Sequence, residues 1–132
     1  MTLVVDASVV VAALIDGGSE GVWAERLISS DAIVAPHLML AEAANILRLA
    51  ARAGDISQDA ATMAYSSLQD LAVELYPYER FANRIWELRH NVTTYDAWYV
   101  ALAEFLDIAL ATLDRRLTRA KGTRCRFVTP PA

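Results

Sequence analysis

The feature that most constrains the fold is the alternation of short apolar runs with longer stretches of helical periodicity. Strands are expected at residues 2–5, 32–35, 73–76, 108–113 and 126–128. Helices are expected at residues 7–15, 20–29, 38–52, 57–70, 79–89, 96–105 and 115–120. This alternation predicts an α/β fold with a mostly parallel sheet and helices on both faces. Right-handed crossovers then bring the carboxyl ends of the strands to one edge, where open α/β sheets bind ligands.

The length and composition are those of one domain covering residues 1–132, large enough to bury a core. Although 55% of the residues are hydrophobic, charges interrupt every run before the roughly 18 apolar residues of a membrane span. We therefore expect no membrane partner. The first residues lack a basic leader, which favours a cytoplasmic location. A single Cys125, with only His37 and His90, excludes an internal disulfide and a Cys/His zinc site.

The charge is unevenly distributed along the chain. The net charge is −4, yet all 16 acids lie within residues 1–114. The last 18 residues carry no acid and six cations, which are Arg115, Arg116, Arg119, Lys121, Arg124 and Arg126. This segment is either a solvated basic terminus or a strip that contacts phosphates. The charge pattern alone leaves both readings open.

Four acidic residues lie within or at the end of apolar runs, where acids are uncommon. They are Asp6, Glu42, Asp96 and Asp114. An unpaired carboxylate in an apolar setting loses its hydration, so it takes up a proton, pairs with a cation or binds a metal. No Lys or Arg is adjacent in sequence to Glu42 or Asp96. Four such acids in one small domain predict a shared carboxylate site, whose oxygen ligands suit a hard cation.

The predicted elements bring these acids toward one edge of the sheet. Asp6 and Asp114 end strands, and Glu42 lies near the start of a helix that follows a strand. The placement of Asp96 is less determined because its helix follows another helix. Taken singly, each acid has a simpler explanation, as a turn residue, a helix cap or the partner of an arginine. Their joint occurrence at one edge favours the shared site.

Other chemistries lack their sequence signatures. The chain has no glycine-rich phosphate loop, no nucleophile elbow and no dinucleotide-binding fingerprint. His37 and His90 are interpreted as structural or surface residues. Trp86 and Trp98 occur at helical spacing among apolar residues and are expected in the core.

The acid-containing segments resemble the motifs of PIN-domain ribonucleases. They are Val4-Val5-Asp6-Ala7-Ser8, Pro36 followed by Glu42 and Asn45, Thr94-Tyr95-Asp96-Ala97-Trp98-Tyr99-Val100-Ala101-Leu102-Ala103-Glu104, and Thr112-Leu113-Asp114-Arg115-Arg116-Leu117. All four occur in order, and the resemblance runs from about Val4 to Phe127. In its length and in the residues of these motifs, the chain most resembles the VapC toxins of bacterial toxin–antitoxin pairs.

The resemblance implies a three-layer α/β/α fold with about five strands in the order 3-2-1-4-5. It also implies a Mg²⁺- or Mn²⁺-dependent endoribonuclease, usually a homodimer, that a small VapB-like antitoxin holds inactive. Metal-binding and catalytic roles fall on Asp6, Glu42, Asp96 and Asp114, with Asp6 and Asp96 as the main metal ligands. Supporting polar roles fall on Ser8, Asn45 and Thr112. The RNA phosphates are expected to contact Arg115, Arg116 and Arg119.

Two other function classes remain open at this stage. A phosphoacceptor signalling domain also uses a strand-end Asp and Mg²⁺ on a parallel sheet. Such a domain usually has adjacent acids after the first strand and a Lys after the last, whereas this chain has one early Asp and only Lys121. The other alternative is a non-catalytic binding module with the PIN fold.

Overall fold

The computed structural model describes residues 1–132, and its five strands form one sheet in the order β3-β2-β1-β4-β5. Every neighbouring pair of strands is parallel. The strands are β1 (Thr2–Val5), β2 (Ala32–Pro36), β3 (Val73–Tyr76), β4 (Leu110–Ala111) and β5 (Phe127–Val128). The expected α/β class and the strand order 3-2-1-4-5 are therefore confirmed.

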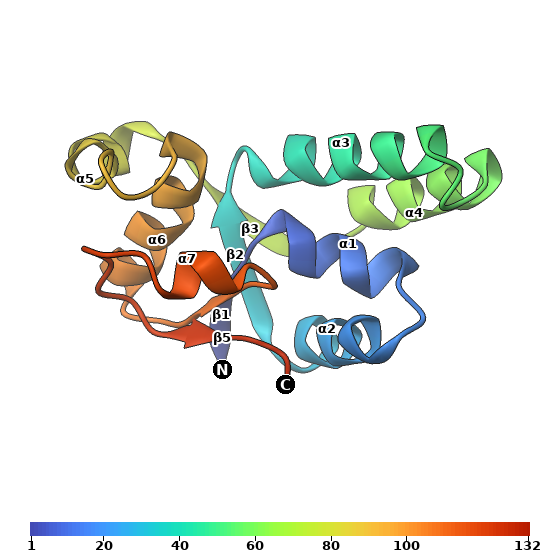
Figure 1. Ribbon diagram of the computed structural model, residues 1–132, viewed down its shortest axis with the longest axis horizontal. Helices are drawn as coiled ribbons and strands as arrows, with labels where there is room; N and C mark the ends of the chain where they lie inside the picture. Colours follow the sequence, from blue (N-terminus) through green and yellow to red (C-terminus); the bar gives the residue numbers. More distant parts are fainter.

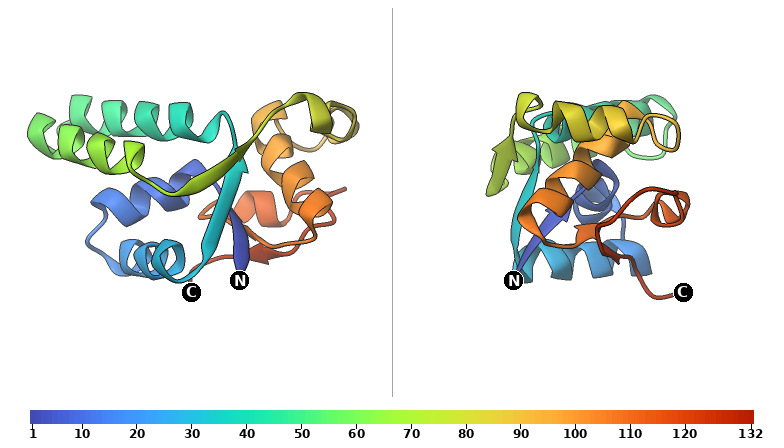
Figure 2. Two further views of the ribbon diagram at one scale, coloured as in Figure 1. Left: turned by 180° about the vertical axis from the view of Figure 1, so that it is seen from behind. Right: turned by 90° about the vertical axis from the view of Figure 1, so that its left-hand side faces the viewer.

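The helices cover both faces of this sheet. They are α1 (Ala7–Ile15), α2 (Ser19–Ser30), α3 (Met39–Arg52), α4 (Gln58–Gln69), α5 (Ala82–Glu87), α6 (Thr94–Leu106) and α7 (Arg115–Thr118), with a 3₁₀ turn at Glu79–Phe81. Helices α1 to α4 gather on one side of the strands, and α5 and α6 lie on the other (Figure 1). The view from behind shows the same division (Figure 2). The result is a three-layer α/β/α arrangement.

The central strand β1 lies between β2 and β4 and is buried from Leu3 to Val5. Val4 and Val5 have no exposed surface, because in a parallel sheet both faces of a strand are covered by helices. The core is one continuous cluster of 30 buried residues that includes β1, α1 and α6. Burial of β1 fixes the position of Asp6, the first residue after it.

Strand β4 is shorter than expected. The sequence predicts a strand over residues 108–113, but only Leu110–Ala111 is a strand. These are the residues that lie in register with Val4 and Val5 of β1 on one side and with β5 on the other. Thr112 still donates from its backbone N–H to the oxygen of Val128 in β5, at 3.0 Å. Asp114 lies three residues beyond β4 rather than directly at its end.

The predicted helix over residues 79–89 is divided into the 3₁₀ turn and α5, and the prediction for one of its aromatic residues is wrong. Trp86 is 66% exposed, whereas Ile85 supplies the buried face of α5. The guanidinium group of Arg89 lies 4.5 Å from the centre of the Trp86 ring. Trp98 is partly buried and packs against the core.

Gly54 and Thr93 fix the end of one helix and the start of another. Gly54, with φ of 82°, follows α3, and such a conformation favours glycine. Thr93 caps α6, because its hydroxyl oxygen accepts a hydrogen bond of 3.1 Å from the backbone N–H of Asp96. The cap fixes the first turn of α6 and with it the position of Asp96.

No single helix is long and apolar enough to cross a membrane. Only α1 and α2 taken together reach the required length and composition, and they are bent by 109° where they meet.

Candidate active site

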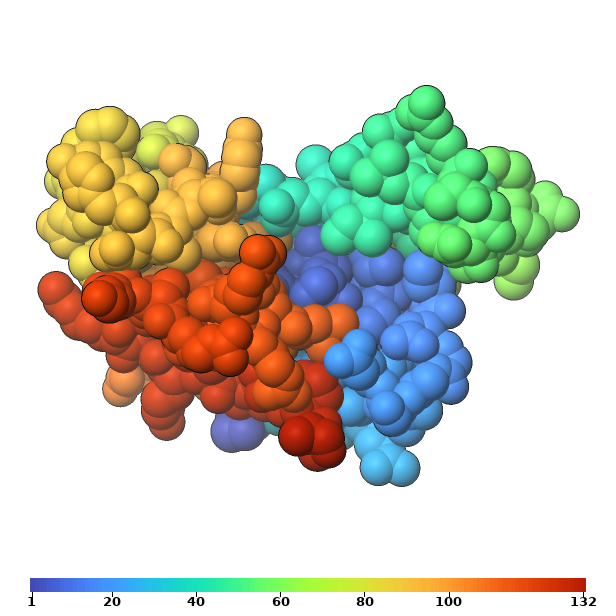
Figure 3. Space-filling view, viewed as in Figure 1, coloured from blue at the N-terminus to red at the C-terminus, as the bar shows by residue number.

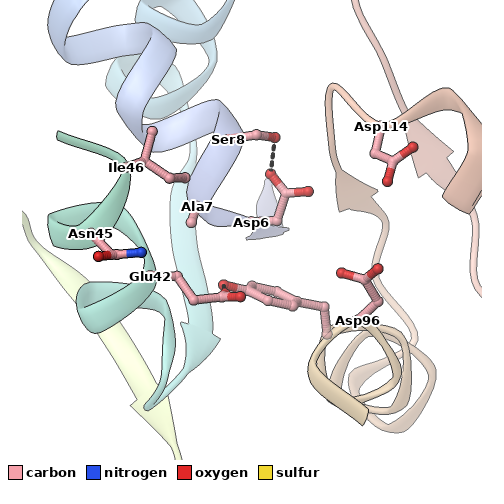
Figure 4. Close-up of a pocket in the computed structure, with 9 residues that line it drawn as sticks. Asp6, Ala7, Ser8, Glu42, Asn45, Ile46, Asp96 and Asp114 are labelled. Atoms are coloured by element: carbon pink, nitrogen blue, oxygen red, sulfur yellow. Dashed lines mark hydrogen bonds between the residues drawn. The ribbon is translucent and has the colours of Figure 1, made fainter. Parts of the chain in front are cut away.

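A cavity of about 300 Å³ lies at the carboxyl edge of the sheet, and all four acids line it. The remaining lining residues are Ala7, Ser8, Asn45, Ile46 and Tyr99. In the space-filling view, blue N-terminal residues are visible in a hollow between the start of α3 and the orange segments (Figure 3). The close-up shows Asp6 between Glu42 on one side and Asp96 and Asp114 on the other (Figure 4). The structure therefore brings together the four predicted acids from four separate segments.

Asp6 and Asp114 are helix caps as well as cavity-lining residues. Asp6 directly follows β1, and its side chain accepts a hydrogen bond of 3.2 Å from the backbone N–H of Val9 in α1. Asp114 caps α7 by accepting from the N–H groups of Arg116, at 2.9 Å, and Leu117, at 3.4 Å. Capping orients both carboxylates at the edge of the sheet, so the simpler explanation of these acids and the shared site are compatible.

Glu42 and Asp96 each lie in the first turn of a long helix. Glu42 belongs to α3, which follows β2, and Asp96 belongs to α6. The positive end of a helix dipole stabilises an anion there modestly. Although α6 follows another helix, its amino end reaches the same cavity. This settles the placement of Asp96, which the sequence left less determined.

Two hydroxyl groups hold the carboxylate of Asp6. Ser8 Oγ donates to Asp6 Oδ1 at 2.5 Å, and Thr112 Oγ1 donates to Asp6 Oδ2. Each hydroxyl oxygen in turn accepts from a backbone N–H, that of Leu113 at 3.3 Å for Ser8 and that of Asp114 at 3.0 Å for Thr112. Each hydroxyl therefore donates to Asp6 and accepts from the backbone, so its direction is set. The two hydroxyls together hold the Asp6 carboxylate in one orientation.

The pKa of Asp6 is raised above its ordinary value. Burial is the largest cause, and the nearby charge of Asp96 adds to it, while the hydrogen bonds from Ser8 and Thr112 lower the pKa. Burial also raises the pKa of Glu42, again with a contribution from Asp96. No Lys or Arg lines the cavity, and the one ion pair of its four acids is the exposed pair of Asp114 with Arg116.

The pKa of Asp96 is raised in the same way, first by burial and then by the charge of Asp114. The hydrogen bond with Thr93 and the charge of Arg116 lower it. A raised pKa means that these carboxylates bind a proton more readily than in water. A cation bound in the cavity would offset the negative charge of these carboxylates, as a bound proton does.

Sequence reasoning missed one residue of the site, Tyr99. Its hydroxyl donates a hydrogen bond of 2.6 Å to Oε1 of Glu42, and the residue is only 1% exposed. Burial raises the pKa of Tyr99, and the adjacent carboxylate raises it further. The only available signal was the spacing of three residues between Asp96 and Tyr99, which places both on one helix face. The partner, Glu42, is 57 residues away in sequence.

A family model for the PIN domain matches residues 3–122. The chain is 43% identical over 125 residues to Ribonuclease VapC1 of Mycobacterium tuberculosis, covering 94% of each protein. It is 39% identical over 129 residues to Ribonuclease VapC9 of the same organism, covering 98% of each. The chain belongs to the PIN-domain family of VapC ribonucleases.

Solved structures share the fold at lower sequence identity. The crystal structure of Mycobacterium tuberculosis VapC20, described as a sarcin–ricin loop cleaving toxin, matches with a TM-score of 0.66 and 21% identity over 92% of this chain and 96% of that one. VapBC2 from Rickettsia felis, solved bound to a DNA fragment from its promoter, matches with a TM-score of 0.68 and 14% identity over 99% and 100%. At these identities the matches show the fold alone.

The ligand set of this PIN domain suits a hard divalent cation, because every titratable group in the cavity offers oxygen. PIN-domain ribonucleases in general depend on a divalent metal. As the side chains lie, no group of three His, Cys, Asp or Glu residues is arranged to hold an ion together. An ion here would therefore take one or two carboxylates and keep several waters, which is the usual coordination of Mg²⁺.

The three arginines predicted to contact RNA phosphates differ in their contacts. Arg115 donates to the backbone oxygen of Pro130 at 2.6 Å and to Thr129 Oγ1 at 3.3 Å, so it holds the C-terminal segment. The side chain of Arg116 is 91% exposed and lies 3.8 Å from Asp114. It lines a second hollow that Asp96 and Asp114 also border. Arg119 is exposed but lines neither hollow.

Asn45, predicted as a supporting residue, also borders the main cavity. It lies one turn after Glu42 on α3, and its side-chain oxygen accepts from Nε of Arg48 at 3.0 Å. The amide is therefore oriented by a neighbour on the same helix.

Proposed function

We propose that this protein is a metal-dependent endoribonuclease and the toxin of a type II toxin–antitoxin module. The observation that carries the proposal is the convergence of Asp6, Glu42, Asp96 and Asp114 on one cavity at the carboxyl edge of the sheet. The relatives named Ribonuclease VapC, at up to 43% identity over most of the chain, support RNA as the substrate.

The ion is Mg²⁺, with Mn²⁺ as its substitute. Asp6 and Asp96 are its main ligands, Glu42 lies across the cavity from Asp96, and Asp114 completes the carboxylate set. When bound, a divalent ion lowers the pKa of water and offsets negative charge on the phosphate during in-line attack. The chain itself supplies orientation and a proton acceptor.

Glu42 is the residue that we assign to the attacking water. Tyr99 occupies its Oε1 atom, and Oε2 has no hydrogen-bond partner within the chain. That second oxygen can accept a hydrogen bond from water and take up its proton. Because burial raises the pKa of Glu42, the carboxylate is a better base than an exposed one.

Arg116 and Arg119 are the proposed RNA phosphate contacts, with Arg115 as a third member of the strip. A guanidinium group binds phosphate regardless of base sequence. Arg116 is the best placed, because it borders a hollow that shares Asp96 and Asp114 with the main cavity. Its exposed pairing with Asp114 at 3.8 Å is too weak to compete with a phosphate.

The proposed partners are a VapB-like antitoxin and a second copy of the chain, and the proposed location is the cytoplasm. Among the structural matches, VapBC-5 from Mycobacterium tuberculosis is described as a member of the VapBC family of toxin–antitoxin systems, which supports the antitoxin. The resemblance of the motifs to VapC toxins supports the homodimer. Sedimentation of the purified chain, alone and with the product of the neighbouring gene, tests both.

The alternatives have less support. A phosphoacceptor domain usually has adjacent acids after its first strand and a Lys near its aspartate, whereas Asp6 is the only acid directly after β1 and Lys121 is exposed outside the cavity. A non-catalytic module would have no use for four carboxylates in one cavity that no Lys or Arg lines, because their mutual repulsion lowers the stability of the fold.

The test is RNA cleavage by purified protein. Total RNA and structured RNA are incubated with Mg²⁺ or Mn²⁺, and then with excess EDTA. We expect defined cleavage products with either ion and none with EDTA. Undiminished cleavage in EDTA would rule out the mechanism, and no cleavage of any RNA would favour the binding module.

A further inference from the structure

Tyr99 is the buried polar group of the site for which the four-carboxylate chemistry has no use. It follows Asp96 by three residues on α6, so the two side chains lie on one face of the helix. The residue is only 1% exposed, and its hydroxyl donates to Glu42 Oε1 on α3 at 2.6 Å. One residue thus connects the helix that carries Asp96 to the helix that carries Glu42.

Glu42 needs such a connection to remain in the cavity. Its carboxylate is repelled by the charges of Asp6 and Asp96, and both raise its pKa. It is only partly buried, and a Glu side chain has three rotatable bonds, so repulsion alone would favour rotamers that point into solvent. No Lys or Arg lines the cavity to hold it. The hydroxyl of Tyr99 is the one side-chain donor that reaches Glu42.

We propose that Tyr99 is a positioning residue: its hydrogen bond to Oε1 holds Glu42 in the cavity and leaves Oε2 directed to water or a hydrated cation. This inference rests on the proposed function for its catalytic consequence. Its geometric part, that Glu42 is held by Tyr99, is independent of the reaction. Loss of one hydrogen bond to a charged group changes an equilibrium constant or a rate by roughly tenfold to hundredfold.

The test is a double-mutant cycle of Tyr99→Phe and Glu42→Ala. Phe keeps the buried ring and removes only the hydroxyl, and thermal melting first establishes that each variant is folded. Tyr65→Phe is the matched control, because Tyr65 is 45% exposed on α4 and outside the cavity. Two quantities are measured for each protein, the kinetics of RNA cleavage and the affinity for Mn²⁺ by calorimetry.

We expect Tyr99→Phe to lower kcat by roughly tenfold or more with little change in KM. It should also weaken Mn²⁺ binding, while Tyr65→Phe changes neither. In the Glu42→Ala background, Tyr99→Phe should have no further effect, because there is no carboxylate left to hold. A merely structural role would give the same loss in both backgrounds, and that result overturns the proposal.

The two measurements separate this proposal from the proposed function. If the wild type cleaves no RNA but the Mn²⁺ affinities show the expected coupling, the ribonuclease assignment fails and the role of Tyr99 stands. If RNA is cleaved but Tyr99→Phe changes neither the rate nor the Mn²⁺ affinity, the role of Tyr99 fails and the ribonuclease assignment stands.

Discussion

Thr112 connects two acids of the site, because its hydroxyl donates to Asp6 Oδ2 and accepts from the backbone N–H of Asp114 at 3.0 Å. Thr112 is fully buried, and it follows β4 directly. The preceding residue, Ala111 of β4, accepts a hydrogen bond of 3.2 Å at its backbone oxygen from the N–H of Asp6. The relative position of the two strand-end acids is therefore set by one side chain and one backbone bond.

Replacing Thr112 by Val should destabilise the protein. Val has nearly the same shape, but it leaves the N–H of Asp114 and one oxygen of Asp6 without their partner, at a cost of about 1–3 kcal/mol. For a chain of this size that cost corresponds to a fall in Tm of roughly 3–12 °C. Thr62→Val, at an exposed position on α4, is the control and should change Tm little. Equal melting temperatures for the two variants would contradict the role of Thr112.

Removing the exposed arginines should weaken RNA binding and reduce its dependence on salt. Each cation that contacts a phosphate releases counterions, so the slope of log affinity against log salt decreases when contacts are lost. The Arg116→Ala and Arg119→Ala double variant is compared with Arg26→Ala, on the distant helix α2. Binding is measured with the catalytically silent protein in EDTA. An unchanged slope in the double variant would place the phosphate contacts elsewhere.

The stability of the metal-free protein should depend on pH through the raised carboxyl pKa values. Burial raises the pKa of Glu42, so the folded state binds this proton more tightly than the unfolded state. The free energy of unfolding therefore decreases as pH rises through the folded pKa, and the loss is absent below the unfolded value of about 4.

Glu42→Gln removes this dependence and keeps an oxygen that accepts from Tyr99. In EDTA at pH 7 the variant should melt higher than the wild type, and the difference in Tm should shrink toward pH 5. Comparing the two proteins cancels the contribution of other groups to the pH dependence. One such group is Glu104, whose pKa is lowered. Burial alone would raise this pKa, but the hydrogen bond from Arg84 and the other interactions of the carboxylate together outweigh burial. A difference that does not change with pH would contradict the raised pKa.

The sequence identifies the acids because each interrupts an apolar run, and that signal is local. Asp6 could be placed because the apolar residues of β1 end directly before it. Asp114 could be placed only approximately, since the length of β4 depends on its register with β1 and β5 rather than on its own residues.

The features that the sequence did not predict depend on contacts that are not local in the chain. The bond between Tyr99 and Glu42 joins residues 57 positions apart, and no pattern within either helix encodes it. Trp86 was expected in the core from its spacing, but α5 is short and buries Ile85 instead. The contact of Arg115 with the C-terminal segment likewise depends on where the chain returns after β5.

The central claim is that the four acids act as one divalent-cation site, and melting with and without Mg²⁺ tests it most directly. Asp96→Asn removes one charge from the cavity, whereas Asp59→Asn removes one from the exposed first turn of α4. With Mg²⁺ at 100 times its dissociation constant, the wild type should gain about 2.7 kcal/mol, or roughly 10 °C in Tm. Asp59→Asn should keep the full gain and Asp96→Asn should lose most of it, while melting higher than wild type without metal. If both variants respond to Mg²⁺ alike, the four acids do not form one site.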